Sequence, residues 1–271
     1  MHAATLHKPH VATHTNQAFV DTNVTGTLNL LEEAVVQKVR AFIFTSTTSV
    51  YALAVRPGEE EPAVWVTEDL PVAPKNIYGH TKVAAEGLCE LFHRRHELAC
   101  LILRTSRFFP EADDRLEVRQ AFEDTNAKGN ELLHRRVDLQ DATDAHLRAM
   151  EQATTLGFGR YIISATTPFA PQDVDALRDS MPDVVRRLHP EYEAFYETRG
   201  WKMQKGIGRI YDNARARTDL FWEPTIDFAT ALARLGRGER PFQARTYEVG
   251  IKGYHEEHFG EMPYPVDPRE P

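Results

Sequence analysis

The stretch VRAFIFTSTTSVY, residues 39–51, decides the fold because it joins a continuous apolar run to a run of hydroxyl side chains. The apolar part, 39–45, is too short for a helix and shows no polar alternation, so we expect a strand covered on both faces. The hydroxyl-rich part, 46–51, follows directly. Because ligands bind at the carboxyl edge of open parallel sheets, this segment is expected to reach a ligand site.

The flanking segments repeat the order of helix and buried strand. A second helix is expected over 76–96 with a strand over 99–104, and a third pair over 141–153 and 160–165. Apolar residues at three- and four-residue spacing predict the first helix over 17–38, with one buried face formed by Val20, Val24, Leu28, Leu31 and Val35. The sequence therefore predicts an α/β fold, a doubly wound parallel sheet with helices on both faces.

The composition of the chain changes after residue 165. Residues 166–271 are richer in proline, arginine and aromatic residues, and short helices are expected within 171–181 and 227–236. We therefore predict a sheet domain over 1–165 and a smaller C-terminal lobe with a proline-rich tail over 166–271.

The overall composition limits the kinds of partner. The 271 residues carry a formal net charge of −8 and the pI is about 5.8, which argues against nucleic acid or an anionic membrane as the main partner. Cys89 and Cys100 form no C-x-x-C motif, and no apolar run approaches the roughly 18 residues needed to cross a bilayer. We expect a cytoplasmic protein with a small-molecule substrate.

The stretch NIYGHTK, residues 76–82, places Tyr78 one helical turn before Lys82. This spacing alone is a weak signal. Its chemistry is specific, however, because a nearby ammonium lowers the pKa of a phenol, and the dipole of a helix capped by Asn76 also favours the phenolate. A hydroxyl at the strand end could align a substrate alcohol for proton transfer. Hydride would then pass to a cofactor, since no side chain accepts it.

The order of these motifs resembles the extended short-chain dehydrogenases/reductases, the NAD-dependent epimerase/dehydratase group with UDP-glucose 4-epimerase-like members. That resemblance implies a Rossmann-like domain over 1–165 and a substrate-binding lobe over 166–271. The segments that carry it are HAAT (2–5), NVTGT (23–27), FTSTTSVY (44–51), YGHTK (78–82), LRTSRFFP (103–110), RRVDLQDATDAHLRAME (135–151) and DLFWEP (219–224).

The resemblance also implies a role for each matching residue. Tyr78 would be the catalytic base or acid, Lys82 would bind the nicotinamide ribose and tune Tyr78, and Thr47 would position the reacting hydroxyl. The binding site for NAD or NADP would be lined by Ala3, Ala4, Thr5, Asn23, Thr45, Tyr78, Lys82 and Ser106. The substrate would meet Thr48, Ser49 and Arg107, and the protein would form a homodimer.

Two departures from the family pattern affect these expectations. The sequence has no G-x-x-G-x-x-G motif, and its only glycine-rich candidate, KGIGRI at 205–210, we interpret as a loop. Met1 stands where the fourth strand of the family ends, so the N-terminal strands are expected to be missing and cofactor binding to be weakened. Arg107 replaces an asparagine of the family, and Phe221 replaces a glycine before Trp222, where it is expected to change only a turn.

Three functions stay open at this point. The first is an epimerase or dehydratase acting on a nucleotide sugar or similar hydroxyl substrate, and the second is a reductase or dehydrogenase of a smaller substrate. The third is a truncated, catalytically silent chain. We expect no metal site, because the N-terminal histidines lack zincin spacing, and we interpret Asp138 and Asp141 as hydrogen-bonding or helix-capping residues rather than a catalytic pair.

Overall fold

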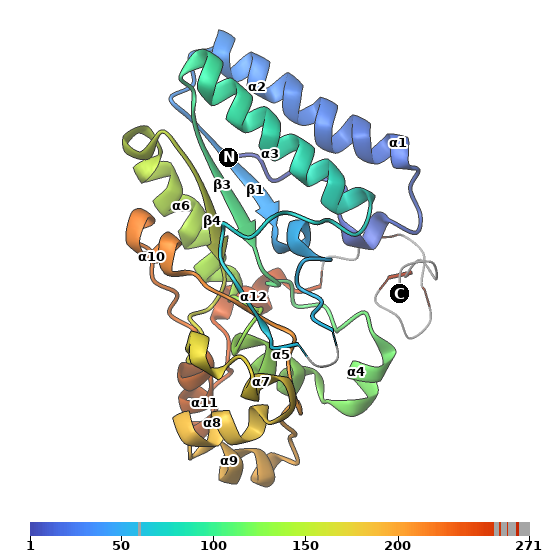
Figure 1. Cartoon of the computed structure of the whole chain (residues 1–271), viewed down its shortest axis with the longest axis vertical. Coiled ribbons are helices and arrows are strands. Elements are labelled where there is room, and N and C mark those ends of the chain that lie inside the picture. Colours follow the sequence, from blue (N-terminus) through green and yellow to red (C-terminus); the bar gives the residue numbers. More distant parts are fainter. Residues whose placement is uncertain (59–60, 252–254, 256–258, 260–263, 266–271) are drawn as a thin grey trace.

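The main sheet of the protein has three parallel strands in the order β1-β3-β4 (Figure 1). The computed structural model describes residues 1–58, 61–251, 255, 259 and 264–265. The strands are β1 (Ala41–Thr47), β3 (Ala99–Thr105) and β4 (Phe158–Ile163). His2 pairs with the free edge of β1, because its amide donates to Ile43 O at 2.8 Å and its carbonyl accepts from Thr45 N at 3.0 Å. The predicted parallel sheet is thus confirmed.

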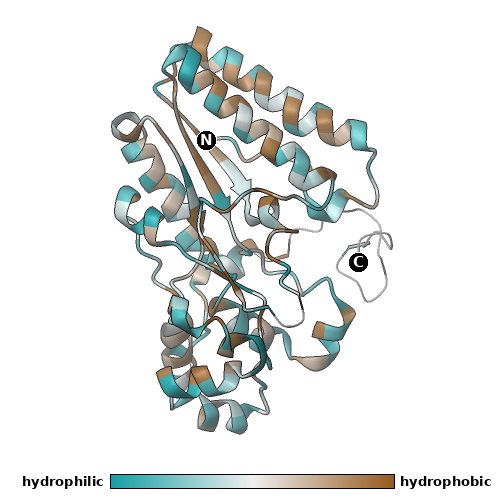
Figure 2. Cartoon of the chain, viewed as in Figure 1, coloured by the Kyte–Doolittle hydropathy of each residue, from teal (hydrophilic) through white to brown (hydrophobic). Residues whose placement is uncertain are grey.

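Helices cover both faces of this sheet. Helices α2 (Gly26–Val36) and α3 (Ile77–His96) lie on one face, and α6 (Leu139–Leu156) and α10 (Ala214–Leu220) lie on the other (Figure 1). Alternate strand residues serve the two cores, which explains why β1 is apolar as far as Phe44 and β3 as far as Leu103. Figure 2 shows the hydropathy of each element. The first core includes Phe42, Phe44, Cys100 and Ile102, and the second Ile43, Leu101 and Leu103.

The helix predicted over 17–38 is interrupted. It consists of α1 (Asn16–Phe19), a π-helical segment η2 (Val20–Thr25) and α2. A π turn holds about one residue more than an α turn and rotates the following side chains. Asn23 and Thr27 therefore point inward and are buried, whereas only Leu31 of the predicted apolar face is fully buried. Leu28 and Val35 are half-buried and pack against the core that contains Leu31, as the predicted face requires, while Val20 and Val24 are only half-buried.

The second lobe is built mostly of short helices. It carries a two-stranded parallel sheet of β2 (Val64–Val66) and β5 (Arg209–Tyr211). Its core also takes Ala63, Leu132 and Leu133 from earlier in the chain, so the division at residue 165 stays a prediction. The helices of this part are α4 (Leu116–Ala121), α5 (Asp124–Leu132), α7 (Ala176–Asp179), α8 (Met181–Leu188), α9 (Tyr192–Arg199), α11 (Phe228–Gly236) and α12 (Ala244–Val249), with a 3-10 turn at η4 (Pro171–Asp173). Two further 3-10 turns, η1 (Lys8–His10) and η3 (Thr48–Tyr51), lie before α1 and after β1.

Residues 205–208 of the glycine-rich segment form the predicted loop, whereas Arg209 and Ile210 already belong to β5. Ile207 N donates to Leu177 O at 2.8 Å, which holds the loop against α7. A Cβ atom on Gly206 would lie only 1.6 Å from Arg178 O. Close backbone packing within the lobe therefore accounts for this glycine.

Phe221 ends α10 in a left-handed conformation, with φ of 51°, and its side chain is 71% exposed. Left-handed backbone costs a residue with a Cβ atom roughly 1–2 kcal/mol, and an exposed ring regains little of this by packing. Phe221→Gly is therefore expected to raise the free energy of unfolding by about 1 kcal/mol in urea denaturation. Phe221→Ala is the matched control, because it removes the ring and keeps the strain. Equal gains in both variants would contradict this explanation.

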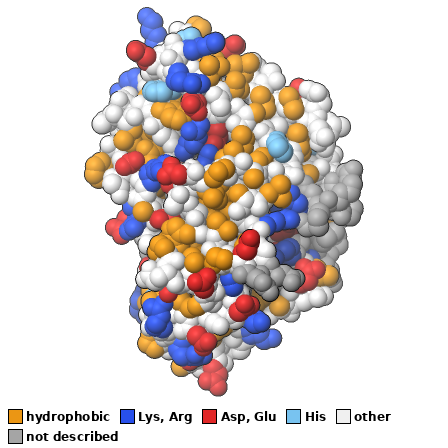
Figure 3. Space-filling model, viewed as in Figure 1, with side chains coloured by type: hydrophobic (Ala, Val, Ile, Leu, Met, Phe, Trp, Pro, Cys, Tyr) orange, Lys and Arg blue, Asp and Glu red, His pale blue; other side chains and the backbone are white. Residues whose placement is uncertain are grey.

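Acidic, basic and hydrophobic side chains are intermixed on the face shown in Figure 3. In the part of the chain that the structure describes, no helix is long and apolar enough to cross a membrane.

Candidate active site

The candidate site lies where the carboxyl end of β1 meets the first turn of α3. Asn76 caps α3 as predicted, because its Oδ1 accepts from Gly79 N at 3.1 Å. Thr47 ends β1, and its Oγ1 accepts from Ser49 N at 3.1 Å. A Cβ atom on Gly79 would lie 2.8 Å from Pro74 Cβ and 3.2 Å from Ser49 O. The glycine after Tyr78 therefore lets the helix approach the strand end closely.

Tyr78 and Thr47 meet at this junction. Their side chains are hydrogen-bonded, and Tyr78 is only 9% exposed. Burial raises the pKa of Tyr78 to about 12, and the bond with Thr47 opposes that rise. The phenol is therefore protonated at neutral pH, ready to donate a proton.

Lys82 lies one turn farther along α3 and is also buried. Its Nζ donates to Thr45 O at 2.6 Å and lies 4.2 Å from the centre of the Phe44 ring. Burial lowers the pKa of Lys82 to about 8. At Tyr78 burial is the largest influence on the pKa, and its hydrogen bond comes from Thr47, so the tuning of Tyr78 by Lys82 stays a prediction. The ammonium donates one hydrogen bond to the end of β1.

The predicted cofactor residues of the N-terminal segment are held together by Asn23. Its Oδ1 accepts from Leu6 N at 2.8 Å and from Thr5 Oγ1 at 2.9 Å, and its Nδ2 donates to Thr81 Oγ1 at 3.0 Å. The amide thus ties the segment after His2 to α3. Ala3 and Ala4 in the same segment are exposed.

Two further predicted cofactor residues lie near the carboxyl ends of strands: Thr45 in β1 and Ser106 just after β3. Thr45 Oγ1 is hydrogen-bonded to His146 Nε2 at 2.8 Å, while His146 Nδ1 contacts Ala142 O at 2.7 Å. Because a carbonyl accepts, Nδ1 carries the proton and Thr45 donates to Nε2. Ser106, just after β3, has a buried Oγ with no hydrogen-bond partner among the described residues. Burying an unpaired hydroxyl costs free energy, so Ser106 Oγ is a candidate contact for a bound ligand.

The predicted substrate residues are positioned differently from one another. Thr48 and Ser49 lie half-buried in η3, next to Thr47. Arg107 Nη1 pairs with Asp113 Oδ2 at 2.6 Å and with Glu131 Oε1 at 3.1 Å, and its side chain is 31% exposed. The Arg107 guanidinium is therefore paired with two carboxylates of the protein itself.

Three residues near the site escaped sequence reasoning. The ring of His7 lies 6.3 Å from that of Tyr78 and 5.6 Å from that of Phe109. His146 contacts Thr45, and Glu86 follows Lys82 by one turn. Of the three, only Glu86 could have been found from the sequence, because an acidic residue four positions after Lys82 lies on the same face of the helix. Among the described residues, no three His, Cys, Asp or Glu side chains form a group that could hold a metal ion.

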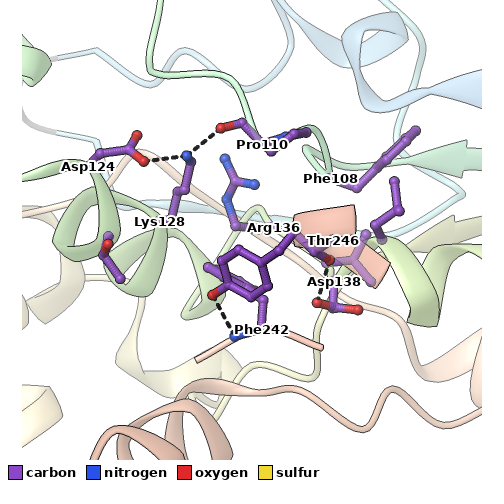
Figure 4. Close-up of a pocket in the computed structure, with 12 residues that line it drawn as sticks. Phe108, Pro110, Asp124, Lys128, Arg136, Asp138, Phe242 and Thr246 are labelled. Atoms are coloured by element: carbon purple, nitrogen blue, oxygen red, sulfur yellow. Dashed lines mark hydrogen bonds and ion pairs between the residues drawn. The ribbon is translucent and has the colours of Figure 1, made fainter. Parts of the chain in front are cut away.

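A cavity of about 170 Å³ is lined by residues of the segment after β3 and of α5, α6 and α12, and by none of the predicted site residues (Figure 4). Lys128 bonds Asp124 and Pro110 O there, and Asp138 caps α6 and accepts from Thr246 Oγ1 at 2.9 Å. Asp138 is thus a capping residue, as predicted. Asp141, on α6, accepts from Ile226 N at 3.0 Å, in line with its predicted hydrogen-bonding role.

Comparison with known proteins identifies the family of the chain. Residues 1–157 match the model of the NAD dependent epimerase/dehydratase family. The chain belongs to this family of enzymes, which confirms the resemblance drawn from the motifs.

Two curated relatives illustrate the similarity. A UDP-glucose 4-epimerase of Rhizobium meliloti is 28% identical over 244 residues, covering 78% of this chain and 68% of the relative. The low-salt glycan biosynthesis protein Agl12 of Haloferax volcanii is 38% identical over 93 residues, covering 34% of this chain and 28% of the relative. The chain thus matches only part of the length of these relatives.

Solved structures support the fold. A variant of the UDP-glucuronic acid 4-epimerase from Bacillus cereus, in complex with UDP-4-deoxy-4-fluoro-glucuronic acid and NAD, superposes with a TM-score of 0.54 at 21% identity. The alignment covers 85% of this chain and 71% of that one. A Rossmann-like α/β fold is therefore shown.

Proposed function

We propose that the protein is an NAD(P)-dependent enzyme of the epimerase/dehydratase type that acts on a nucleotide sugar or a similar hydroxyl substrate. One observation carries this proposal: Tyr78 and Thr47 are hydrogen-bonded at the carboxyl end of a parallel strand, with Lys82 one turn away. Family membership and the UDP-sugar epimerases among the relatives support the same reaction class.

The chain's own residues divide the work of proton transfer. Tyr78 Oη gives a proton to the substrate oxygen, or takes one from it, at the end of β1. Thr47 Oγ1 holds both the phenol and the substrate oxygen in line, because it already bonds Tyr78. Bound NAD supplies the hydride acceptor. Thr48 and Ser49, on the turn after Thr47, are the proposed contacts for the remaining substrate hydroxyls.

The residues fit the nicotinamide half of NAD better than the adenosine half. Ser106 Oγ and the Lys82 ammonium provide polar groups near the carboxyl ends of β1 and β3. The sequence contains no G-x-x-G-x-x-G turn to place the pyrophosphate at a helix N-terminus. We therefore propose that this chain binds NAD or NADP with reduced affinity, mainly through Lys82.

This role of Lys82 predicts a pH dependence of binding. Its pKa of about 8 means that the ammonium is present below that pH and is lost above it. NAD affinity is expected to be constant between pH 6.5 and 7.5 and to fall up to about tenfold per pH unit above 8, measured by calorimetry. Lys82→Arg, which stays charged, should shift the fall to higher pH. Affinity that is constant to pH 9.5 in the wild type would contradict the role.

Turnover tests the proposed reaction directly. The protein would be incubated with UDP-glucose or UDP-glucuronic acid and a trace of NAD, and the sugar would be followed by NMR. An epimerase converts many equivalents of sugar for each NAD and leaves no net NADH. Stoichiometric NADH formation would favour a dehydrogenase, and absence of any conversion at saturating NAD would support the silent, truncated alternative.

One observation favours a smaller substrate as the second candidate. The rings of Phe108 and Phe109 lie 4.2 Å apart, and His7 stacks on Phe109 close to Tyr78. Aromatic side chains next to the proposed base favour a compact, partly apolar substrate. A reductase of such a substrate is therefore our alternative.

A cytoplasmic homodimer is also a proposal. Leu30 and Val36 of α2 are exposed, at 46% and 70%, on a helix that packs beside α3. Exposed apolar residues on α2 support a subunit interface.

A further inference from the structure

Glu86 lies at the centre of a buried network behind the proposed site. It follows Lys82 by four residues and Tyr78 by eight, so the three share one face of α3. Glu86 is only 2% exposed. A carboxylate at such a position must be matched by opposite charge and hydrogen bonds, because isolated burial is very costly.

Arg104, on the central strand β3, supplies this match. Its Nε lies 3.1 Å from Glu86 Oε1 and its Nη2 lies 2.7 Å from Oε2, so both carboxylate oxygens are engaged. The remaining guanidinium nitrogen, Nη1, donates to Tyr51 Oη at 2.5 Å. The pair therefore links α3 and β3 to the last residue of η3.

The same carboxylate reaches the end of β1. Ser46 Oγ donates to Glu86 Oε1 at 2.6 Å. Ser46 directly precedes Thr47, and Tyr51 closes the turn that holds Thr48 and Ser49. Glu86 and Arg104 thus fix both sides of the segment that presents Thr47 to Tyr78.

Glu86 also acts on Lys82 through its charge. Burial lowers the pKa of Lys82 to about 8, and the negative charge of Glu86 opposes that lowering. Lys82 Nζ in turn holds Thr45 O, two residues before Thr47. Removal of the carboxylate should therefore disturb both the strand end and the charge of the ammonium.

We infer that Glu86 is a positioning residue of the proposed site, which fixes the end of β1 against α3 and supplies the counter-charge for Lys82. The inference rests on the proposed function for its catalytic consequence, while its electrostatic part concerns the protein alone. The competing explanation is a purely structural ion pair between Glu86 and Arg104, with no effect on Lys82.

The test titrates the Lys82 ammonium by ¹⁵N NMR in the full chain without cofactor, with Lys82→Arg used to assign the signal. Glu86→Gln keeps the shape and removes the charge, and it is expected to lower the titration midpoint by about one pH unit or more. Glu90→Gln is the matched control, because Glu90 lies one turn farther on α3, is half-exposed and pairs with Arg160. The control should keep the wild-type midpoint.

A second variant guards against misfolding of Glu86→Gln. Replacing both partners, as in Glu86→Leu with Arg104→Leu, leaves no unpaired guanidinium at position 104. Arg160, whose Nε lies 3.5 Å from Glu86 Oε2, keeps its pair with Glu90. Its midpoint should also fall below that of the wild type. An unchanged Lys82 midpoint in whichever of these variants folds would overturn the inference and leave Glu86 with a structural role. Because no cofactor is present, failure of NAD binding or turnover in the wild type would refute the proposed function without altering this result.

Discussion

Glu131→Gln is expected to lower the free energy of unfolding by about 3–5 kcal/mol, because it removes a buried negative charge that three arginines share. Glu131 is 4% exposed at its side chain, and its Oε1 lies 3.1 Å from Arg107 Nη1 and 2.7 Å from Arg135 Nη2. Its Oε2 lies 2.8 Å from Arg136 Nε. Glutamine would leave these guanidinium groups facing one another, with Asp113 as the remaining carboxylate that contacts Arg107 and Arg135.

Urea denaturation measures this effect, and an exposed pair provides the control. Arg148 and Glu151 lie 3.0 Å apart and are both 53% exposed, so Glu151→Gln should cost less than about 0.5 kcal/mol. The three arginines hold the pKa of Glu131 well below its ordinary value. The wild type should therefore lose this stabilisation as the pH falls below about 4. Equal losses in the two variants at neutral pH would contradict the assignment.

Tyr78→Phe is expected to reduce turnover by about 10²–10⁴-fold, because it removes the proton that is transferred and keeps the ring that fills the site. The substitution takes one hydrogen bond from Thr47, so the fold should survive. Turnover of the substrate identified by NMR would be compared with NAD affinity measured on the same sample. Affinity should change by less than about threefold, since the proposed contact with the cofactor is Lys82.

A remote tyrosine provides the control for this experiment. Tyr192 lies on α9 in the second lobe, and its Oη donates to Pro182 O at 3.3 Å. Tyr192→Phe should leave turnover unchanged. Retention of more than about a tenth of the activity in Tyr78→Phe would remove this residue from the proton transfer.

The sheet was predictable because its physical cause is local. Strands β1 and β3 are buried on both faces, so every residue of each strand had to be apolar or hydrogen-bonded, and the sequence carries that pattern directly. Helix α3 and its N-cap Asn76 were equally predictable, because a capping residue and the regular spacing of apolar residues can both be recognised in a short stretch of sequence. The order of strand, hydroxyl run and Tyr-x-x-x-Lys helix then predicted which residues would meet.

The features that escaped prediction depend on contacts between distant segments. In the π-helical segment at Val20–Thr25, Asn23 contacts Leu6 and Thr81. The helix was predicted from the spacing of its apolar residues, and that spacing does not show where a polar side chain such as Asn23 points. The partner of Lys82 is a backbone carbonyl, which has no signature in the sequence. Arg107 was expected to meet the substrate, and its pairing with Asp113 and Glu131 in the folded chain could not be read from the sequence.

The most direct test is a calorimetric titration of the folded 271-residue chain with NAD⁺ and NADH, beside Lys82→Ala. We predict micromolar binding in the wild type that is lost in the variant, because the nicotinamide half of the site and its ammonium are present. No binding heat in a folded wild-type sample, or equal affinity in both proteins, would contradict the account.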